Sequence, residues 1–415
     1  MTGGGTGPGA GRRCDDRWTA SGLRALTGRP DGPGLDPPPG LLAGLDALAA
    51  AIAGSSRRLG RPVAVDPLDV LAGRARASGL GRRGDVSCGG SARLVRAVDG
   101  WLAVNLARPA DRELVPAWLG LPQGPEGWGP VLAAVGERSV AGALDDAAGL
   151  GLPVAAVGER APAEGAVAGS APGVRVRRST AGPPRPLADL VVVDLSALWA
   201  GPLVASLLGR GGARVVKVES ADRTDGARRG DAAHYRWLNG GKASVVLDLS
   251  SAAGRHRLTG LVDRADVVVT ASRPRALEQL GLHPGSERPD GGPRVFLSIT
   301  GYGTAPGSAD RVAFGDDAAA AGGLVVWDGD GPCFCADAVA DPATGLAAAA
   351  AVLAELERGG DAWLEASMAD VAAELTVDGD DGPGPVPVAG PGWEPGPVRA
   401  PGADTAAVLA ELGVP

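Results

Sequence analysis

The chain has 415 residues, of which 45% are hydrophobic and only 3% aromatic, and its formal net charge is −8. This length allows two or more domains, each with its own core of mainly aliphatic side chains. The acidic balance argues against general nucleic-acid binding. The four cysteines do not form a disulfide framework in a chain of this size. Cys333 and Cys335 lack a second pair or a nearby histidine, so we expect no metal site.

The N-terminus contains no targeting signal that we can identify. Residues 1–14 lack the apolar core of a signal peptide and predict a disordered tail. No uninterrupted apolar run in the chain is long enough to span a bilayer. We therefore expect a cytoplasmic protein that does not contact a membrane.

Residues 15–160 predict a small α+β domain. The stretch "SARLVRAVDGWLAVNLAR" is typical of a β-hairpin with its turn at Asp99–Gly100. A short strand is expected over 151–159. Helical patterns cover four further stretches: 41–53, 66–77, 111–119 and 128–150. Residues 161–186 are rich in Gly, Pro and Arg and predict a linker.

A glycine motif near the first helices does not indicate nucleotide binding. Residues 79–84, "GLGRRG", satisfy G-x-G-x-x-G, but no strand precedes them, and two arginines occupy positions where a phosphate-binding turn leads into a helix. We interpret this segment as a surface loop.

Residues 187–375 alternate between apolar strands and helices. The expected strands are 190–195, 214–219, 244–249, 266–271 and 294–300, and the expected helices between them are 201–212, 252–265 and 273–282. Strands that are apolar throughout, separated by helices, indicate a parallel sheet covered on both faces. The pattern predicts a Rossmann-like, doubly wound α/β domain, followed by a C-terminal extension over 376–415.

Asp341 stands before Pro342 at the start of an alanine-rich helix that should end at Gly359–Gly360. An aspartate followed by proline is typical of a helix N-cap and first turn. The same position places the carboxylate at the positive end of the helix dipole, where it can act as a nucleophile. From spacing alone, both the capping and the catalytic interpretation stay open.

A weak internal repeat links the two halves of the chain. Residues 20–53 are similar to 321–356, and aligning Gly44–Leu45 with Gly345–Leu346 places Gly40 opposite Asp341. If the repeat is real, only the second copy contains the acid.

Several motifs in order resemble those of the class III CoA-transferases, which include formyl-CoA transferases, carnitine CoA-transferases and α-methylacyl-CoA racemases. They are "LVVVDLSALWAGPLVASLLGRGGARVVKVES", "LNGGKASVVLDLSSAAG" with "RPRALEQLGL", "LSITGYG", "ADAVADPATGLAAAAAVLAEL" and "VRAPGADTAAVLAELG". The segment "GGSARLVRAVDGWLAV" resembles the family's small domain, which normally follows the catalytic aspartate but here precedes it.

The resemblance implies that Asp341 is the nucleophile that exchanges CoA between an acyl-CoA and a carboxylic acid, through an anhydride and an aspartyl-CoA thioester. It implies CoA as a substrate and no permanently bound cofactor. It also implies a homodimer. The residues that match the CoA-binding groove are Trp199, Ala200, Leu238, Asn239, Lys242, Ser272, Arg273 and Arg311. The only other lysine, Lys217, is interpreted as a strand-end residue.

Two alternatives remain at this level. A racemase needs a second acid–base group, usually histidine, and the matching stretch contains Phe314, Asp316 and Asp317 but no histidine. The permuted order and the missing acid of the first copy are also consistent with a non-catalytic CoA-binding relative.

Overall fold

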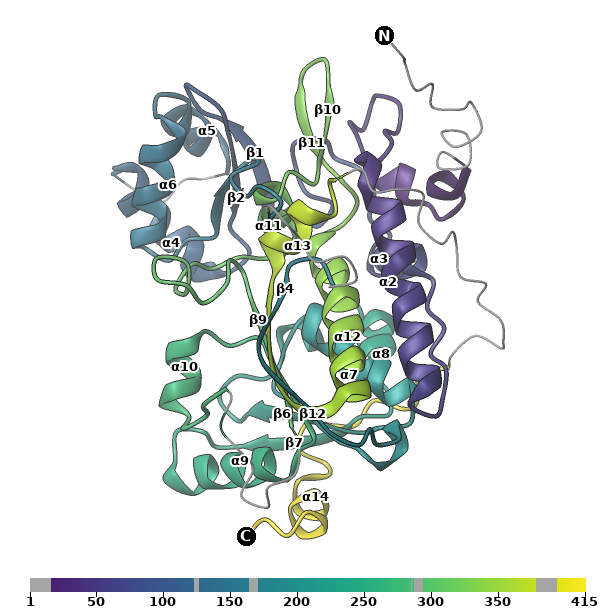
Figure 1. Cartoon of the computed structure of the whole chain (residues 1–415). Coiled ribbons are helices and arrows are strands. Elements are labelled where there is room, and N and C mark those ends of the chain that lie inside the picture. Colours follow the sequence, from purple (N-terminus) through teal and green to yellow (C-terminus); the bar gives the residue numbers. More distant parts are fainter. Residues whose placement is uncertain (1–15, 123–126, 164–170, 285, 287–293, 378–393) are drawn as a thin grey trace.

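The computed structural model describes residues 16–122, 127–163, 171–284, 286, 294–377 and 394–415 (Figure 1). The predicted N-terminal tail, 1–14, lies outside the described residues, as does part of the C-terminal extension.

A seven-stranded sheet forms the centre of the protein, in the order β4-β12-β9-β8-β5-β6-β7. Its strands are β4 (Val174–Ala181), β5 (Val191–Asp194), β6 (Arg214–Ser220), β7 (Ala243–Leu247), β8 (Val267–Thr270), β9 (Val295–Thr300) and β12 (Gly359–Ser367). All neighbouring pairs are parallel except β4 and β12. The α/β class predicted from the sequence is confirmed.

Helices cover both faces of this sheet, as the strands that are apolar throughout require. Within β8, Val268 packs into one core while its neighbours Val267 and Val269 pack into the other. One face carries α2 (Pro39–Arg58), α3 (Pro67–Ser78), α7 (Ala200–Arg210), α8 (Ala232–Asn239), α12 (Ala340–Arg358) and α13 (Met368–Glu374). The other carries α9 (Ala252–Arg264), α10 (Pro274–Gln279) and α14 (Thr405–Glu411).

A smaller three-stranded sheet lies apart from the large one (Figure 1). It comprises β1 (Ala92–Arg96), β2 (Trp101–Asn105) and β3 (Val154–Ala156), with α4 (Pro109–Leu119), α5 (Gly129–Gly136) and α6 (Val140–Gly149) packed against it. The β1–β2 hairpin was predicted with its turn at Asp99–Gly100. The single helix expected over 128–150 is two helices, because the Ser139 side chain accepts a hydrogen bond from Gly142 N–H and caps a new helix.

The remaining elements connect these parts. Between β9 and α12 the chain forms α11 (Gly315–Ala321) and an antiparallel hairpin of β10 (Val325–Asp328) and β11 (Gly331–Phe334). Three short 3₁₀ helices are η1 (Leu23–Leu26), η2 (Leu187–Asp189) and η3 (Gly226–Arg229).

The linker prediction for 161–186 differs from the structure over β4. This strand pairs antiparallel with β12 at the edge of the large sheet. Its sequence, "VRVRRSTA", leaves most side chains partly or fully exposed, so the arginines made it resemble a linker. Arg177 forms an ion pair with the buried Glu365 at 2.6 Å. Charged side chains are typical of an edge strand that must not pair with another chain.

Helix α2 lies beside α12 and runs in the same direction (Figure 1). At their C-terminal ends, Ser55 Oγ donates a hydrogen bond to Glu357 at 3.0 Å, and Arg58 forms an ion pair with the same carboxylate. Leu45 of α2 and Leu346 of α12, which the internal repeat aligns, are both fully buried in one core. Part of the predicted N-terminal domain therefore shares a core with the Rossmann-like domain.

Among the described residues, α2 is also the one helix long and apolar enough to cross a membrane, with 61% of its most apolar window buried. Asp46 interrupts this helix, so it is not the uninterrupted apolar run that the sequence analysis looked for. Because the helix packs on α12, its length and composition alone are weak evidence for a membrane span.

Candidate active site

Asp341 lies in the first turn of α12 and does not cap it. The helix begins at Ala340, and Val339 at the N-cap position already has helical torsion angles and no side-chain cap. The interpretation of Asp341 as the N-cap was therefore wrong, because Val339 occupies that position. The end of the helix agrees with the prediction, because Gly359 adopts the left-handed conformation, with φ of 76°. The Asp341 carboxylate is thus not engaged in capping its own helix.

The first residue of α11 packs directly against this carboxylate. A β-carbon added to Gly315 would lie 2.5 Å from Asp341 Oδ2 and 2.4 Å from the carbonyl oxygen of Ala338. Asp341 as a whole residue is only partly buried. Gly315 therefore lets the N-terminus of α11 approach the Asp341 carboxylate closely.

The backbone just before Asp341 is strained. Ala336 and Ala338 have φ values of 55° and 47°, in the left-handed region that non-glycine residues rarely adopt. Two hydrogen bonds hold them there: Ala336 N–H donates to Thr27 Oγ1, and Ala338 N–H donates to Asp316 Oδ1, each at 3.1 Å. Such strain, maintained by surrounding contacts, clusters at functional sites.

Two further aspartates and one arginine surround Asp341. Arg74, from α3, donates to the fully buried Asp337 through Nε at 2.7 Å and through Nη2 at 2.5 Å. Burial raises the pKa of Asp341 to about 7, against the opposing charge of Arg74, with Asp316 and Asp337 raising it further. Burial and Asp337 likewise raise the pKa of Asp316 to about 6. Near neutral pH the cluster therefore exchanges protons, as a site for acid–base or nucleophilic chemistry requires.

Trp199 forms the aromatic side of the same cluster. Arg74 lies over its ring, 5.4 Å from the centroid, and His234 meets it edge-on with centroids 4.8 Å apart. Burial, with a contribution from Arg74, lowers the pKa of His234 to about 4, so the imidazole is neutral at pH 7. Helix α8 therefore brings a histidine next to Trp199, although the stretch that matches the family's acid–base position contains none.

Helix α7 crosses α12 one turn beyond Asp341. A β-carbon on Gly345 would lie 2.9 Å from the Ala200 carbonyl oxygen and 2.7 Å from Leu203. Thr344, which lies between Asp341 and Gly345 in the sequence, is fully buried, and its hydroxyl has no hydrogen-bond partner among the described residues. The Trp199–Ala200 turn, predicted as part of the CoA groove, thus lies next to the first turns of α12.

Lys242, predicted to contact CoA, is buried and fully engaged by protein. Its ammonium donates to Asp194 at 2.8 Å, to the Pro202 carbonyl at 2.9 Å and to Asn239 Oδ1 at 3.0 Å. Burial lowers the pKa of Lys242 to about 8. All three ammonium donors have partners in the structure, so a contact of Lys242 with CoA stays a prediction.

Lys217 is also buried and supports the loop that follows β5. Its ammonium donates to the Ser196 carbonyl at 3.0 Å and forms an ion pair with Asp225 at 2.9 Å. Asp225 in turn accepts from the Leu198 N–H at 3.0 Å, and Leu198 has a left-handed φ of 68°. The two lysines therefore position the turn that carries Trp199.

The other residues predicted to line the CoA groove differ in burial and in the contacts they make. Leu238 is fully buried in the core, Arg273 is exposed at the N-terminus of α10, and Ser272 is partly buried beside it. Arg311 is paired with Glu159 at 2.7 Å, and its guanidinium stacks 3.6 Å from the Tyr302 ring centroid. Arg311 therefore connects the segment after β3, through Glu159, to the loop after β9, through Tyr302.

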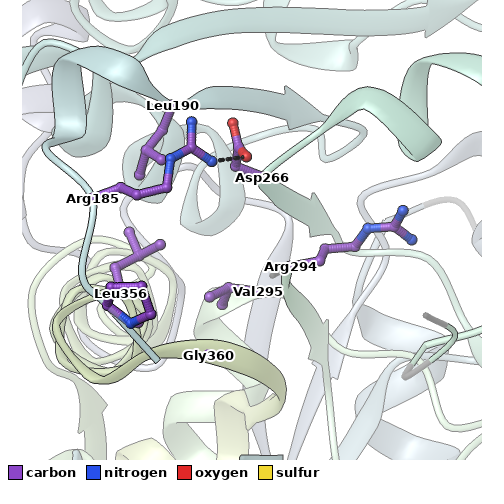
Figure 2. A pocket seen from close by; sticks show the side chains of 9 residues that line it. Arg185, Leu190, Asp266, Arg294, Val295, Leu356 and Gly360 are labelled. Atoms are coloured by element: carbon purple, nitrogen blue, oxygen red, sulfur yellow. Dashed lines mark hydrogen bonds and ion pairs between the residues drawn. The ribbon is translucent and has the colours of Figure 1, made fainter. Parts of the chain in front are cut away.

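Asp341 lines neither of two small hollows in the described part of the chain. The larger, with about 300 Å³ of non-atom space including open solvent, lies between Leu356 of α12 and Arg294 before β9 (Figure 2). The Arg185–Asp266 ion pair, at 2.6 Å, crosses it. This hollow is next to the amino ends of the strands, away from the cluster. The smaller, of about 180 Å³, is lined by Asn239 and Lys242 among other residues.

We find no candidate metal-binding site in the part of the chain that the structure describes. No group of three or more His, Cys, Asp or Glu side chains is arranged to hold a metal ion there. Cys88, Cys333 and Cys335 are free and buried, and burial raises the pKa of Cys335 to about 12.

Three residues of the cluster were missed by sequence reasoning. Asp337 precedes Asp341 by four residues, a spacing that could have drawn attention to it. His234 and Arg74 carry no local signal, because only the fold brings α8 and α3 to the start of α12.

Residues 187–378 match the sequence model of CoA-transferase family III. This part of the chain belongs to that family. It contains β5, the Trp199 turn, the buried lysines, α11 and Asp341, whereas Arg74 lies outside the matched range.

Curated proteins named CoA-transferases match about a third to a half of this chain. The chain is 32% identical over 157 residues to the succinyl-CoA–D-citramalate CoA-transferase of Chloroflexus aurantiacus, covering 34% of this chain and 37% of the relative. It is 35% identical over 180 residues to the formyl-CoA:oxalate CoA-transferase of Streptomyces avermitilis, covering 41% and 44%. A CAIB/BAIF family protein structure from Brucella suis is 28% identical, with 46% of this chain and 55% of that chain covered and a TM-score of 0.41. The chain thus spans about half or less of these relatives' lengths.

Proposed function

We propose that the protein is a CoA-transferase that exchanges CoA between an acyl-CoA thioester and a free carboxylic acid, with Asp341 as nucleophile. The observation that carries this proposal is the placement of Asp341, the residue that matches the family's catalytic aspartate. Its carboxylate lies against Gly315, and burial raises its pKa to about 7.

The exchange proceeds through covalent intermediates on this one carboxylate. Ionised Asp341 attacks the thioester carbonyl, the C–S bond breaks, and a mixed anhydride and CoA thiolate result. The thiolate attacks the aspartyl carbonyl, which releases the donor carboxylate and leaves an aspartyl-CoA thioester. The acceptor carboxylate attacks that thioester and expels the thiolate. The thiolate then attacks the acceptor's carbonyl, which yields the new acyl-CoA and regenerates Asp341.

The raised pKa suits these steps. A carboxylate whose conjugate acid has a pKa near 7 is a stronger base than an ordinary aspartate, yet part of the population stays ionised at neutral pH. The N–H groups at the start of α11, beside Gly315, and of α12 create a positive potential that favours the oxyanions of each addition step. CoA binding by Trp199, Ala200, Asn239 and Lys242 remains part of the proposal.

The direct test traps the intermediate on residue 341. The full chain is incubated with a panel of acyl-CoAs, and the enzyme-bound thioester is cleaved with hydroxylamine, which leaves an aspartyl hydroxamate detectable by peptide mass spectrometry. The modification should appear on the peptide containing Asp341 and vanish in Asp341→Ala, while CoA binding persists. A binding protein without catalysis would show neither hydroxamate nor exchange in the unmodified chain.

Racemisation is a second candidate because His234 lies beside Trp199. A neutral imidazole can remove an α-proton, and the stretch that matches the family offered only Asp316 and Asp317 for this role, without a histidine. Incubation of a 2-methylacyl-CoA in deuterium oxide without an acceptor acid distinguishes the two reactions. A racemase incorporates deuterium at the α-carbon, whereas a transferase does so only at the background rate.

The family resemblance also leads us to propose a homodimer. Light scattering on the full chain tests this: a mass near 82 kDa, twice the chain's 41.1 kDa, supports it, and a mass near 41.1 kDa contradicts it.

A further inference from the structure

The turn that leads from β11 into α12 has an unusual backbone for its sequence. Residues 336–339 form this turn and read Ala-Asp-Ala-Val, without a glycine. Ala336 and Ala338 nevertheless have left-handed φ values of 55° and 47°. Glycine adopts such values readily, whereas alanine keeps them only where surrounding contacts hold it there. The conformation of the turn therefore depends on the groups that bind it.

Thr27 binds the first residue of this turn. Its fully buried hydroxyl donates to the Leu23 carbonyl oxygen at 2.9 Å and accepts from the Ala336 N–H at 3.1 Å. Because the hydroxyl hydrogen is used by Leu23, the lone pairs of the oxygen face the Ala336 amide. Cys88 Sγ lies 3.3 Å from the Ala336 carbonyl oxygen. Residues far away in the chain therefore contact both polar backbone groups of Ala336.

The next two residues of the turn are also held, and they connect it to Asp341. The Asp337 carboxylate accepts from Arg74 Nε at 2.7 Å. Ala338 N–H donates to Asp316 Oδ1 at 3.1 Å, and the Ala338 carbonyl oxygen accepts from the Asp341 N–H at 2.9 Å. The backbone of the turn therefore sets where the first turn of α12 begins.

We propose that Thr27 is a positioning residue for Asp341: its hydroxyl keeps Ala336 in the left-handed conformation, and this fixes the direction in which α12 starts. The inference rests on the proposed function. Thr27 lies outside residues 187–378, which match the family model. The N-terminal part of the chain thus contributes to CoA exchange through the backbone, without contact between Thr27 and the reacting groups.

The test removes the hydroxyl and then removes the need for it. Thr27→Val keeps the shape of the side chain, and kcat for CoA exchange should fall by about 10-fold with KM for the acyl-CoA unchanged, because the nucleophile is misplaced while substrate binding persists. Thr27→Ser retains the hydroxyl and should retain most of kcat. Adding Ala336→Gly to Thr27→Val should restore most of the lost kcat, because glycine adopts the left-handed conformation without the hydrogen bond.

Ser56→Ala is the matched control. Ser56 is also fully buried, donates to the Ile52 carbonyl oxygen at 2.6 Å and accepts from the Val63 N–H at 2.8 Å, but it lies near the C-terminal end of α2. This variant should keep kcat, with or without Ala336→Gly. An unchanged kcat in Thr27→Val, or a loss that Ala336→Gly does not repair, overturns the inference. Should Thr27→Val be too unstable to assay, recovery of folding and exchange by Ala336→Gly supports the inference, and no recovery overturns it.

A second measurement separates this inference from the proposed function. If the unmodified chain shows neither CoA exchange nor hydroxamate, the proposed function fails. Amide hydrogen exchange of the peptide that spans residues 336–341 then tests the role of Thr27 in the backbone. Faster exchange in Thr27→Val than in Ser56→Ala supports that role, and equal exchange in the two variants overturns it.

Discussion

Gly315 and Asp341 are in such close contact that a β-carbon at position 315 would lie 2.5 Å from the Asp341 carboxylate oxygen. Real β-carbons do not approach oxygen that closely, so the first turn of α11 reaches the carboxylate only because residue 315 is glycine. This contact links the start of α11, which follows β9, to the helix that carries Asp341, the proposed nucleophile.

Gly315→Ala should therefore displace the Asp341 carboxylate. We expect CoA exchange to fall by at least about 10-fold, because a reaction rate drops sharply when a reacting group is shifted from its productive position. Steady-state exchange and hydroxamate yield on residue 341 measure the effect. Gly329→Ala, where an added β-carbon meets nothing within 4 Å, is the control and should keep full activity. Equal activity of the two variants would mean that the contact has no catalytic importance.

Asp341→Asn should stabilise the fold at pH 8. The folded pKa of about 7 lies above the ordinary value of 3.8, so the folded state holds the proton more tightly than the unfolded chain. Stability is therefore lost as the pH rises from about 4 to about 7, and asparagine avoids that loss. The linkage predicts a gain on the order of a few kcal/mol.

Urea unfolding at pH 5 and pH 8 measures this difference. Because other groups titrate equally in both proteins, the gain from Asp341→Asn should be larger at pH 8 than at pH 5. A gain that is the same at both pH values would show that the Asp341 pKa is not raised. The same variant should form no hydroxamate.

Lys242→Met should destabilise the protein by about 3–5 kcal/mol, because it leaves the fully buried Asp194 without its cation. The double variant Lys242→Met with Asp194→Asn should recover much of this loss. Thermal unfolding of both variants provides the measurement. If Lys242 instead serves mainly to bind CoA, the single variant would keep its stability and lose CoA affinity.

Gly40→Ala should lower stability by about 1–3 kcal/mol, since a β-carbon there would lie 2.0 Å from the Val377 carbonyl oxygen. Gly73→Ala, in the interior of α3 with nothing within 4 Å, should instead stabilise the protein slightly. Chemical denaturation compares the two.

The crowding at Gly40 also means that the position that the internal repeat aligns with Asp341 has no room for an acidic side chain.

The sequence alone was sufficient for the parallel sheet, because strands such as β8 are apolar throughout and therefore signal burial on both faces. It also indicated Asp341, through the motif around it, and the end of α12 at a glycine. It did not reveal that 174–181 form an edge strand, since alternating arginines are compatible with a linker as well as with a half-exposed strand.

Only the tertiary structure decided the surroundings of Asp341. Arg74 and His234 come from α3 and α8, and Trp199 directly precedes α7. No local pattern encodes which helix ends will meet. The contacts of Lys242 were also decided by the tertiary structure. A lysine at this position suggested a contact with CoA, but the side chain is buried beside Asp194 and its three donors bind protein groups. Local sequence determines helices and strands through short-range periodicity, whereas the charges around a site depend on how those elements pack.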